Sequence, residues 1–160
     1  MGLLKRFFSK SGEFASYEMF GFTHVVMIAL CVIFLFFMLN KTRNASPYQV
    51  KRIVKRSAYI LWTLEFSKII FNLFSGNAGE LNTYIPLYFC SITLYAAVLS
   101  GWAKGYTAKR IGDVFLVVGG IVGGAVYIFM PTTTAGVYPA FHFITIQSYI
   151  LHTVMIFLGQ

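Results

Sequence analysis

The sequence predicts an all-α protein, a polytopic bundle of transmembrane helices, on the basis of two observations. Five apolar stretches fill most of the chain, and each is close to the roughly 20 helical residues that cross a bilayer core of about 30 Å. The composition is 58% hydrophobic and only 11% charged, whereas a soluble domain is about one quarter charged. We expect five spans, at about residues 21–39, 47–75, 84–100, 111–130 and 138–158.

The first 19 residues differ in character from the spans. The apolar residues there recur at helical spacing, with Leu3 and Leu4 before the basic pair Lys5–Arg6 and with Phe7 and Phe8 after it. This pattern predicts an amphipathic, interfacial segment over residues 1–19, with a partly disordered tail as the alternative. The transmembrane helical domain is then expected to cover residues 20–160.

Local signals refine three of the helix boundaries and roles. Ser46 followed by Pro47 is a good helix start, with serine as N-cap and proline at the first helical position. Pro86 fits the first turn of the span at 84–100, where a missing N–H costs nothing. The fourth span carries two overlapping pairs of small residues, which predict close packing against a neighbouring helix and leave a ligand cleft as the alternative: Gly119, Gly120, Gly123 and Gly124.

The basic residues predict the orientation. Nine Lys and Arg residues lie in the loops at 40–56 and 101–110, whereas the loops after the second and fourth spans hold none. Basic loops favour the cytoplasmic side, so we expect an integral, multi-pass protein of the cell membrane with its N-terminus outside. The net charge of +8 is then explained by contacts with anionic lipid, and no nucleic-acid partner is predicted.

A polar stripe interrupts the second span. Glu65, Lys68 and Asn72 follow the i, i+3, i+7 spacing that places side chains on one helix face. An ion pair between Glu65 and Lys68 lowers the cost of immersing both charges, and the stripe is expected to face the bundle interior. It serves either to hold helices together or as the electropositive wall of a substrate-binding site.

Five further side chains are expected to converge on this stripe when depth is counted at 1.5 Å per residue from the helix ends. They are candidate binding and catalytic residues: His24, Cys90, His142, Gln147 and His152. Cys90 is the candidate nucleophile, because a nearby lysine or histidine would favour the reactive thiolate. His142 lies nearer to Cys90 than His152 does in this depth count. Cys31 is interpreted as a small hydrophobic residue.

Other site classes find no support in the sequence. No CxxC or HExxH spacing is present, so no metal site is predicted. No phosphate loop, dinucleotide motif or serine-centred elbow is present either, and no cofactor is predicted.

Three motifs together resemble the YwaF / transmembrane protein 164 family of multi-spanning membrane proteins. They are the Glu65, Lys68, Asn72 stripe, the segment YIPLYFCSI at 84–92, and the FH…QSYILH pattern at 141–152. Animal relatives have been proposed to be phospholipid acyltransferases that use a cysteine and a histidine. The resemblance makes Cys90 that cysteine and either His142 or His152 the histidine. Because family members usually continue for further spans, it also implies a truncated chain or a partner that supplies helices.

Three functions are compatible with these observations. The first is a membrane-embedded acyltransferase in which Cys90 attacks a lipid ester, a histidine acts as base and Lys68 favours the thiolate. The second is a binding or transport protein whose polar stripe holds a small solute or ion. The third is a non-catalytic scaffold. The expected partners are membrane lipids, together with a second copy or other membrane subunits that contact the glycine-rich fourth helix.

Overall fold

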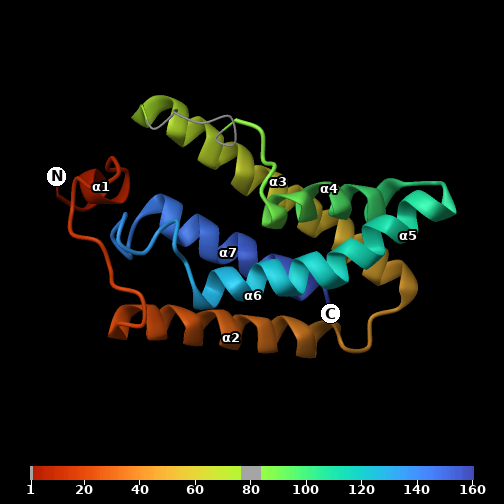
Figure 1. Cartoon of the computed structure of the whole chain (residues 1–160). Coiled ribbons are helices and arrows are strands. Elements are labelled where there is room, and N and C mark those ends of the chain that lie inside the picture. The colour runs from red at the N-terminus through yellow and green to blue at the C-terminus, as the bar shows by residue number, and fades with distance from the viewer. Residues whose placement is uncertain (1, 77–83) are drawn as a thin grey trace.

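The computed structural model describes residues 2–76 and 84–160, and these residues form helices and turns with no strand among them. The all-α prediction is therefore confirmed for the described residues. In Figure 1, α2 lies along one side of α6 and α7, and α3 and α4 lie along the other. The helical elements are α1 (Gly2–Phe7), α2 (Phe22–Thr42), α3 (Pro47–Ser75), α4 (Phe89–Trp102), α5 (Tyr106–Phe115), the π-helical turn η2 (Leu116–Gly120), α6 (Ile121–Phe129) and α7 (Phe143–Leu158).

Two helical stretches in the described part of the chain are long and apolar enough to cross a membrane. One is α2, with 21 residues, and the other is the continuous helix formed by α5, η2 and α6, with 24 residues. The apolar helices α4 and α7 are shorter, with 14 and 16 residues, and α3 is long but carries charged side chains. The count of five spans remains a prediction.

The boundaries of α3 agree with the sequence signals. The Ser46 hydroxyl accepts a hydrogen bond from the backbone N–H of Gln49, and the Gln49 side chain accepts one from the backbone N–H of Ser46. This capping box and Pro47 start the helix where predicted. Gly76 ends it with φ of 72°, a left-handed conformation that glycine adopts without strain. The rest of the predicted polar turn, residues 77–82, lies outside the described residues.

Three of the five predicted helix starts were wrong. The fourth span starts earlier than expected, at Tyr106 and not at 111. Helix α4 begins at Phe89 and not near residue 84, so Pro86 precedes the helix instead of lying in its first turn. Proline disfavours helical conformation in the residue before it, and residues up to the N-cap Tyr88 stay non-helical. Helix α7 begins at Phe143 and not at 138, after a turn-rich segment that contains Pro139.

Helix α7 is the centre of the bundle and packs against α2, α3 and α6. The glycines of the fourth predicted span allow the closest of these contacts. A Cβ atom on Gly120 would lie 2.7 Å from the backbone oxygen of Met155, and one on Gly124 would lie 2.7 Å from that of His152. At Gly120 and Gly124, the expected close packing is thus made within the chain, between the helix formed by η2 and α6 and helix α7.

The N-terminal segment packs on the loop that precedes α7. Backbone hydrogen bonds join Gly12 to Val137, and Tyr17 to both Gly136 and Tyr138. Phe7 and Phe8, at the end of α1, also pack against three aromatic rings from the rest of the chain. These rings are Phe71, Phe141 and Phe143. The segment therefore covers one end of the bundle.

Candidate functional site

A cavity of about 510 Å³ lies between α3, α4, α6, α7 and the residues that follow α6. Six of the eight residues singled out in the sequence line it: Glu65, Lys68, Asn72, Cys90, Gln147 and His152. They come from three helices that are distant in the sequence. The stripe on α3 does face the interior, since only 2% of Glu65 is exposed.

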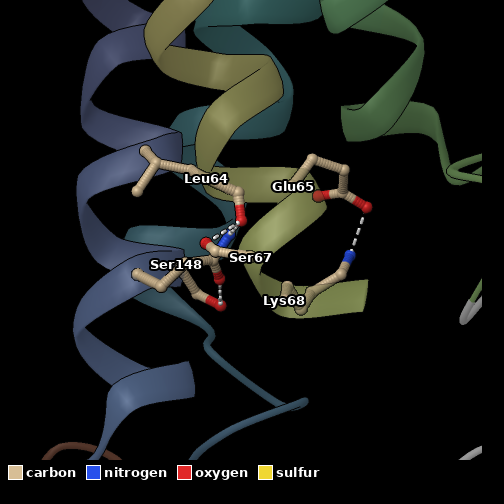
Figure 2. Close-up of polar contacts among 6 residues, drawn as sticks. Leu64, Glu65, Ser67, Lys68 and Ser148 are labelled. Atoms are coloured by element: carbon tan, nitrogen blue, oxygen red, sulfur yellow. Dashed lines mark hydrogen bonds and ion pairs between the residues drawn. The ribbon is translucent and has the colours of Figure 1, made fainter. Parts of the chain in front are cut away.

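The α3 wall of the cavity carries an ion pair. Lys68 Nζ lies 2.5 Å from Glu65 Oε1, one turn earlier on the same helix. Figure 2 shows the lysine turned back toward the carboxylate, on the side of α3 away from Leu64. The Glu65 side chain is almost fully buried, and that of Lys68 is 21% exposed. The negative charge of the buried carboxylate is therefore balanced by the positive charge of this lysine.

Gln147 joins the α7 wall to α3. Its side-chain amide donates to the backbone carbonyl of Leu64, at 3.1 Å, and its carbonyl accepts from the Ser148 hydroxyl, also at 3.1 Å. Figure 2 shows Leu64 and Ser148 on facing helices at this link. The contact fixes the α7 residues around Ser148 relative to the ion pair.

Cys90 occupies the second position of α4, directly after the N-cap Tyr88 and Phe89. The first backbone N–H groups of a helix have no partner within the helix, and the helix dipole favours negative charge at that end. A Cβ atom on Gly123 of α6 would lie 3.5 Å from the Cys90 Cβ, so α6 approaches the cysteine closely. The thiol therefore lies at a helix start that opens on the cavity.

The His152 imidazole is held with one nitrogen free. Its Nδ1 donates to the Ser148 carbonyl at 2.7 Å, which leaves Nε2 as the acceptor nitrogen of the neutral ring. Nε2 is buried and has no hydrogen-bond partner among the described residues. An unpaired buried acceptor is costly unless a ligand or reacting group supplies the proton. His152 therefore lines the cavity with one nitrogen that can still accept a hydrogen bond.

Tyr127 supports the imidazole from α6 and was missed in the sequence analysis. Its ring stacks on that of His152, with centroids 3.8 Å apart and planes within 9°. Its hydroxyl pairs with Thr134 at 2.8 Å, and Thr134 pairs with Tyr17 at the same distance. The sequence does contain a signal for Tyr127, because it lies on the same predicted helix face as three of the glycines. The i, i+3, i+4, i+7 spacing is that of Gly120, Gly123, Gly124 and Tyr127.

His142 lies outside the set of residues that line the cavity. Its Nδ1 accepts from the backbone N–H of Ile144 and so caps α7, and its Nε2 donates to the Ser9 carbonyl at 3.1 Å. With both nitrogens hydrogen-bonded to backbone, His142 holds the N-terminal segment against the start of α7.

His24 is likewise placed away from the cavity lining. Its Nδ1 accepts from the backbone N–H of Phe20, and its Nε2 donates to the Ile128 carbonyl. The side chain is fully buried. His24 therefore links the start of α2 to the end of α6.

The cavity thus combines a thiol at a helix start, an imidazole with a free acceptor nitrogen and a buried ion pair. In the described part of the chain, no group of three or more His, Cys, Asp or Glu side chains is arranged to hold a metal ion. The residues present suit nucleophilic chemistry by a thiol or the binding of a polar group.

The model of the TMEM164 family matches residues 19–159 of this chain. The chain belongs to the TMEM164 family. No curated protein and no solved structure gives a significant match. The match covers almost the whole chain apart from α1 and the turn that follows it.

Membership of the TMEM164 family confirms the resemblance that the three sequence motifs indicated. All three lie within the matched residues, at 65–72, 84–92 and 141–152. With the family and the apolar helices α2 and α5–α6, the chain is a membrane protein. In this TMEM164 family member, each of the three motifs contributes side chains to the same cavity, since Glu65, Cys90 and His152 all line it.

Proposed function

We propose that the protein is a membrane-embedded acyltransferase that uses Cys90 as nucleophile and His152 as general base. The observation that carries the proposal is the free Nε2 of His152, which is buried beside a cavity that Cys90 also lines. His152 is preferred to His142 because both nitrogens of His142 are hydrogen-bonded to backbone groups.

The first half of the reaction forms a thioester. His152 Nε2 takes the proton from the Cys90 thiol, and the sulfur attacks the carbonyl carbon of a lipid ester. The ester C–O bond breaks, and the leaving alcohol takes the proton back from His152. Backbone N–H groups at the start of α4 would stabilise the negative charge that develops on the carbonyl oxygen.

The second half returns the enzyme to its starting state. An acceptor alcohol loses its proton to His152 and attacks the thioester carbonyl, and the C–S bond breaks. The sulfur leaves as a thiol after it recovers the proton from His152. Lys68 favours the transient thiolate through its positive charge, and Glu65 keeps the lysine in place.

The test is to trap the acyl-enzyme. The purified protein is incubated in vesicles that contain phospholipid with a labelled acyl chain, and the label released by neutral hydroxylamine is measured. Wild type is expected to carry a thioester, Cys90→Ala none, and His152→Gln is expected to form it about 100-fold more slowly or worse. His142→Gln is the matched control and is expected to label at nearly the wild-type rate. Label that persists in Cys90→Ala, or a wild type that carries none, would refute the proposal.

A second candidate function is binding or transport of a small polar solute or ion. The observation in its favour is the buried pair of Glu65 and Lys68 on the cavity wall, which offers both a cation and an anion partner. It predicts that Glu65→Gln abolishes binding while Cys90→Ser has no effect. The acyltransferase predicts the opposite order, with Cys90→Ser the more damaging change.

A further inference from the structure

The cavity is lined by both polar and apolar side chains. Lys68, Gln147 and the cavity face of Glu65 form part of the polar wall. The apolar wall includes Phe89 at the start of α4 and Val122 and Val126 on α6. These polar residues belong to α3 and α7, and these apolar residues belong to α4 and α6.

The apolar residues that line the cavity also lie on the outer surface. Phe89 is 52% exposed, Val122 is 50% exposed and Val126 is 57% exposed. A side chain that both lines a cavity and is half exposed marks the rim of an opening. Val122 and Val126 belong to the helix formed by α5, η2 and α6, which is long and apolar enough to span a membrane. Exposed valines on such a helix contact lipid acyl chains.

Among the described helices, α4 and α6 are joined less closely than their neighbours. Helix α4 packs mainly on α3 and α5, and α6 packs mainly on α7, while α4 and α6 make few contacts with each other. They approach at Cys90 and Gly123, where glycine contributes no side chain. Cys90 therefore lines the same cavity as the exposed valines of α6.

We propose that a lipid acyl chain enters the cavity sideways from the bilayer, between the start of α4 and α6, with Val122 and Val126 at the rim. An apolar opening on a lipid-facing helix fits a hydrocarbon chain, and the polar wall beyond it accommodates the ester and headgroup region. The inference deepens the proposed function and concerns the same cavity. Its test measures access to the Cys90 thiol and does not require that acyl transfer takes place.

The experiment uses the full chain in vesicles with Cys31→Ala as background, because Cys31 lies on a separate apolar groove and would also react. Two maleimides are compared, one with a long alkyl chain that partitions into the bilayer and one that is charged and water-soluble. Modification of Cys90 is followed by the mass of the intact protein. The alkyl maleimide is expected to modify Cys90 from within the membrane.

Bulk at the rim should then block one reagent selectively. Val122→Trp and Val126→Trp are expected to slow the alkyl maleimide at least about tenfold, the rate change that a barrier of about 1.4 kcal/mol produces. The rate of the charged maleimide should stay unchanged. Val114→Trp is the matched control, since Val114 is 55% exposed on the same continuous helix but does not line the cavity.

The lateral route is overturned if the tryptophan variants slow neither reagent, or slow both equally, or if Val114→Trp has the same effect as Val122→Trp. It is also overturned if the alkyl maleimide fails to reach Cys90 in the background protein. These results are distinguishable from failure of the proposed function, which would show as absence of a thioester while the alkyl maleimide still enters by the lateral route.

Discussion

The imidazole of His152 lies flat on the phenol ring of Tyr127, with ring centroids 3.8 Å apart. One edge of the imidazole is fixed by the Ser148 carbonyl, and one face is fixed by Tyr127. The tyrosine is itself held by Thr134, which also bonds Tyr17 of the N-terminal segment. The free Nε2 is thus positioned by direct contacts from α6 and α7, and the α6 contact is supported through Thr134 by the N-terminal segment.

Tyr127 is therefore expected to act as a positioning residue for the base. Tyr127→Phe keeps the ring and should retain most of the thioester formation, whereas Tyr127→Leu removes the stacked face. Since stacked aromatic pairs contribute about 0.5–1.5 kcal/mol, we expect Tyr127→Leu to be slower than Tyr127→Phe by about two- to tenfold. The measurement is the rate of thioester formation as a function of pH.

A merely structural role for Tyr127 makes a different prediction. Both variants would then lose thermal stability in proportion to their loss of rate, and the pH profile of the remaining activity would keep its shape. A positioning role predicts that the profile of Tyr127→Leu is displaced while that of Tyr127→Phe matches wild type. Equal profiles for all three proteins would contradict it.

Helix α3, the second predicted span, and its polar stripe could be predicted from the sequence because the signals are local. The start at Ser46 and Pro47 depends on hydrogen bonds within a single turn, and the structure has the same capping box. The inward orientation of Glu65 follows from the cost of placing a carboxylate against lipid. These inferences needed no knowledge of neighbouring helices.

The choice of histidine could not be predicted, because it depends on how the helices are staggered. The depth count assumed that each apolar segment is helical from its first residue, which placed Cys90 nearer to His142 than to His152. In the structure, α4 begins only at Phe89, so Cys90 lies at a helix start and lines the same cavity as His152. A histidine as N-cap of α7 is also outside the usual preference for Ser, Thr, Asp and Asn.

The ion pair on α3 leads to a prediction about stability. Lys68→Met leaves the buried Glu65 carboxylate without a partner and should lower the free energy of unfolding by about 3–5 kcal/mol. The double variant with Glu65→Gln and Lys68→Met removes both charges and should recover much of that loss. Thermal unfolding in detergent measures each variant, with Lys5→Met as the control, because the pair of Lys5 and Glu13 is exposed. A double variant as unstable as Lys68→Met would contradict this account.

The glycines of α6 differ in how much space they leave, which predicts a graded response to alanine. On Gly124 a Cβ would lie 2.5 Å from the Ile156 side chain and 2.7 Å from the backbone oxygen of His152, so Gly124→Ala should cost about 1–3 kcal/mol. On Gly123 the nearest atoms are 3.4–3.5 Å away, within ordinary contact, and Gly123→Ala should be nearly neutral. Gly105→Ala, in open space, is the control in the same unfolding measurement. Equal losses at Gly123 and Gly124 would show that α6 and α7 pack differently.

The two histidines of α7 are expected to fail in different ways when replaced. His142 caps the helix and holds Ser9, so His142→Ala should lower stability by about 1 kcal/mol or more, and His142→Asn, which keeps a capping side chain, should lower it less. Neither should change how fast Cys90 reacts with the alkyl maleimide in folded protein. His152→Asn should slow that reaction, because no base then takes the thiol proton. The unfolding temperature and the rate of Cys90 alkylation are measured for each variant, and together they separate the two roles. If Cys90 is alkylated slowly in His142→Asn and at the wild-type rate in His152→Asn, the roles of the two histidines have been exchanged.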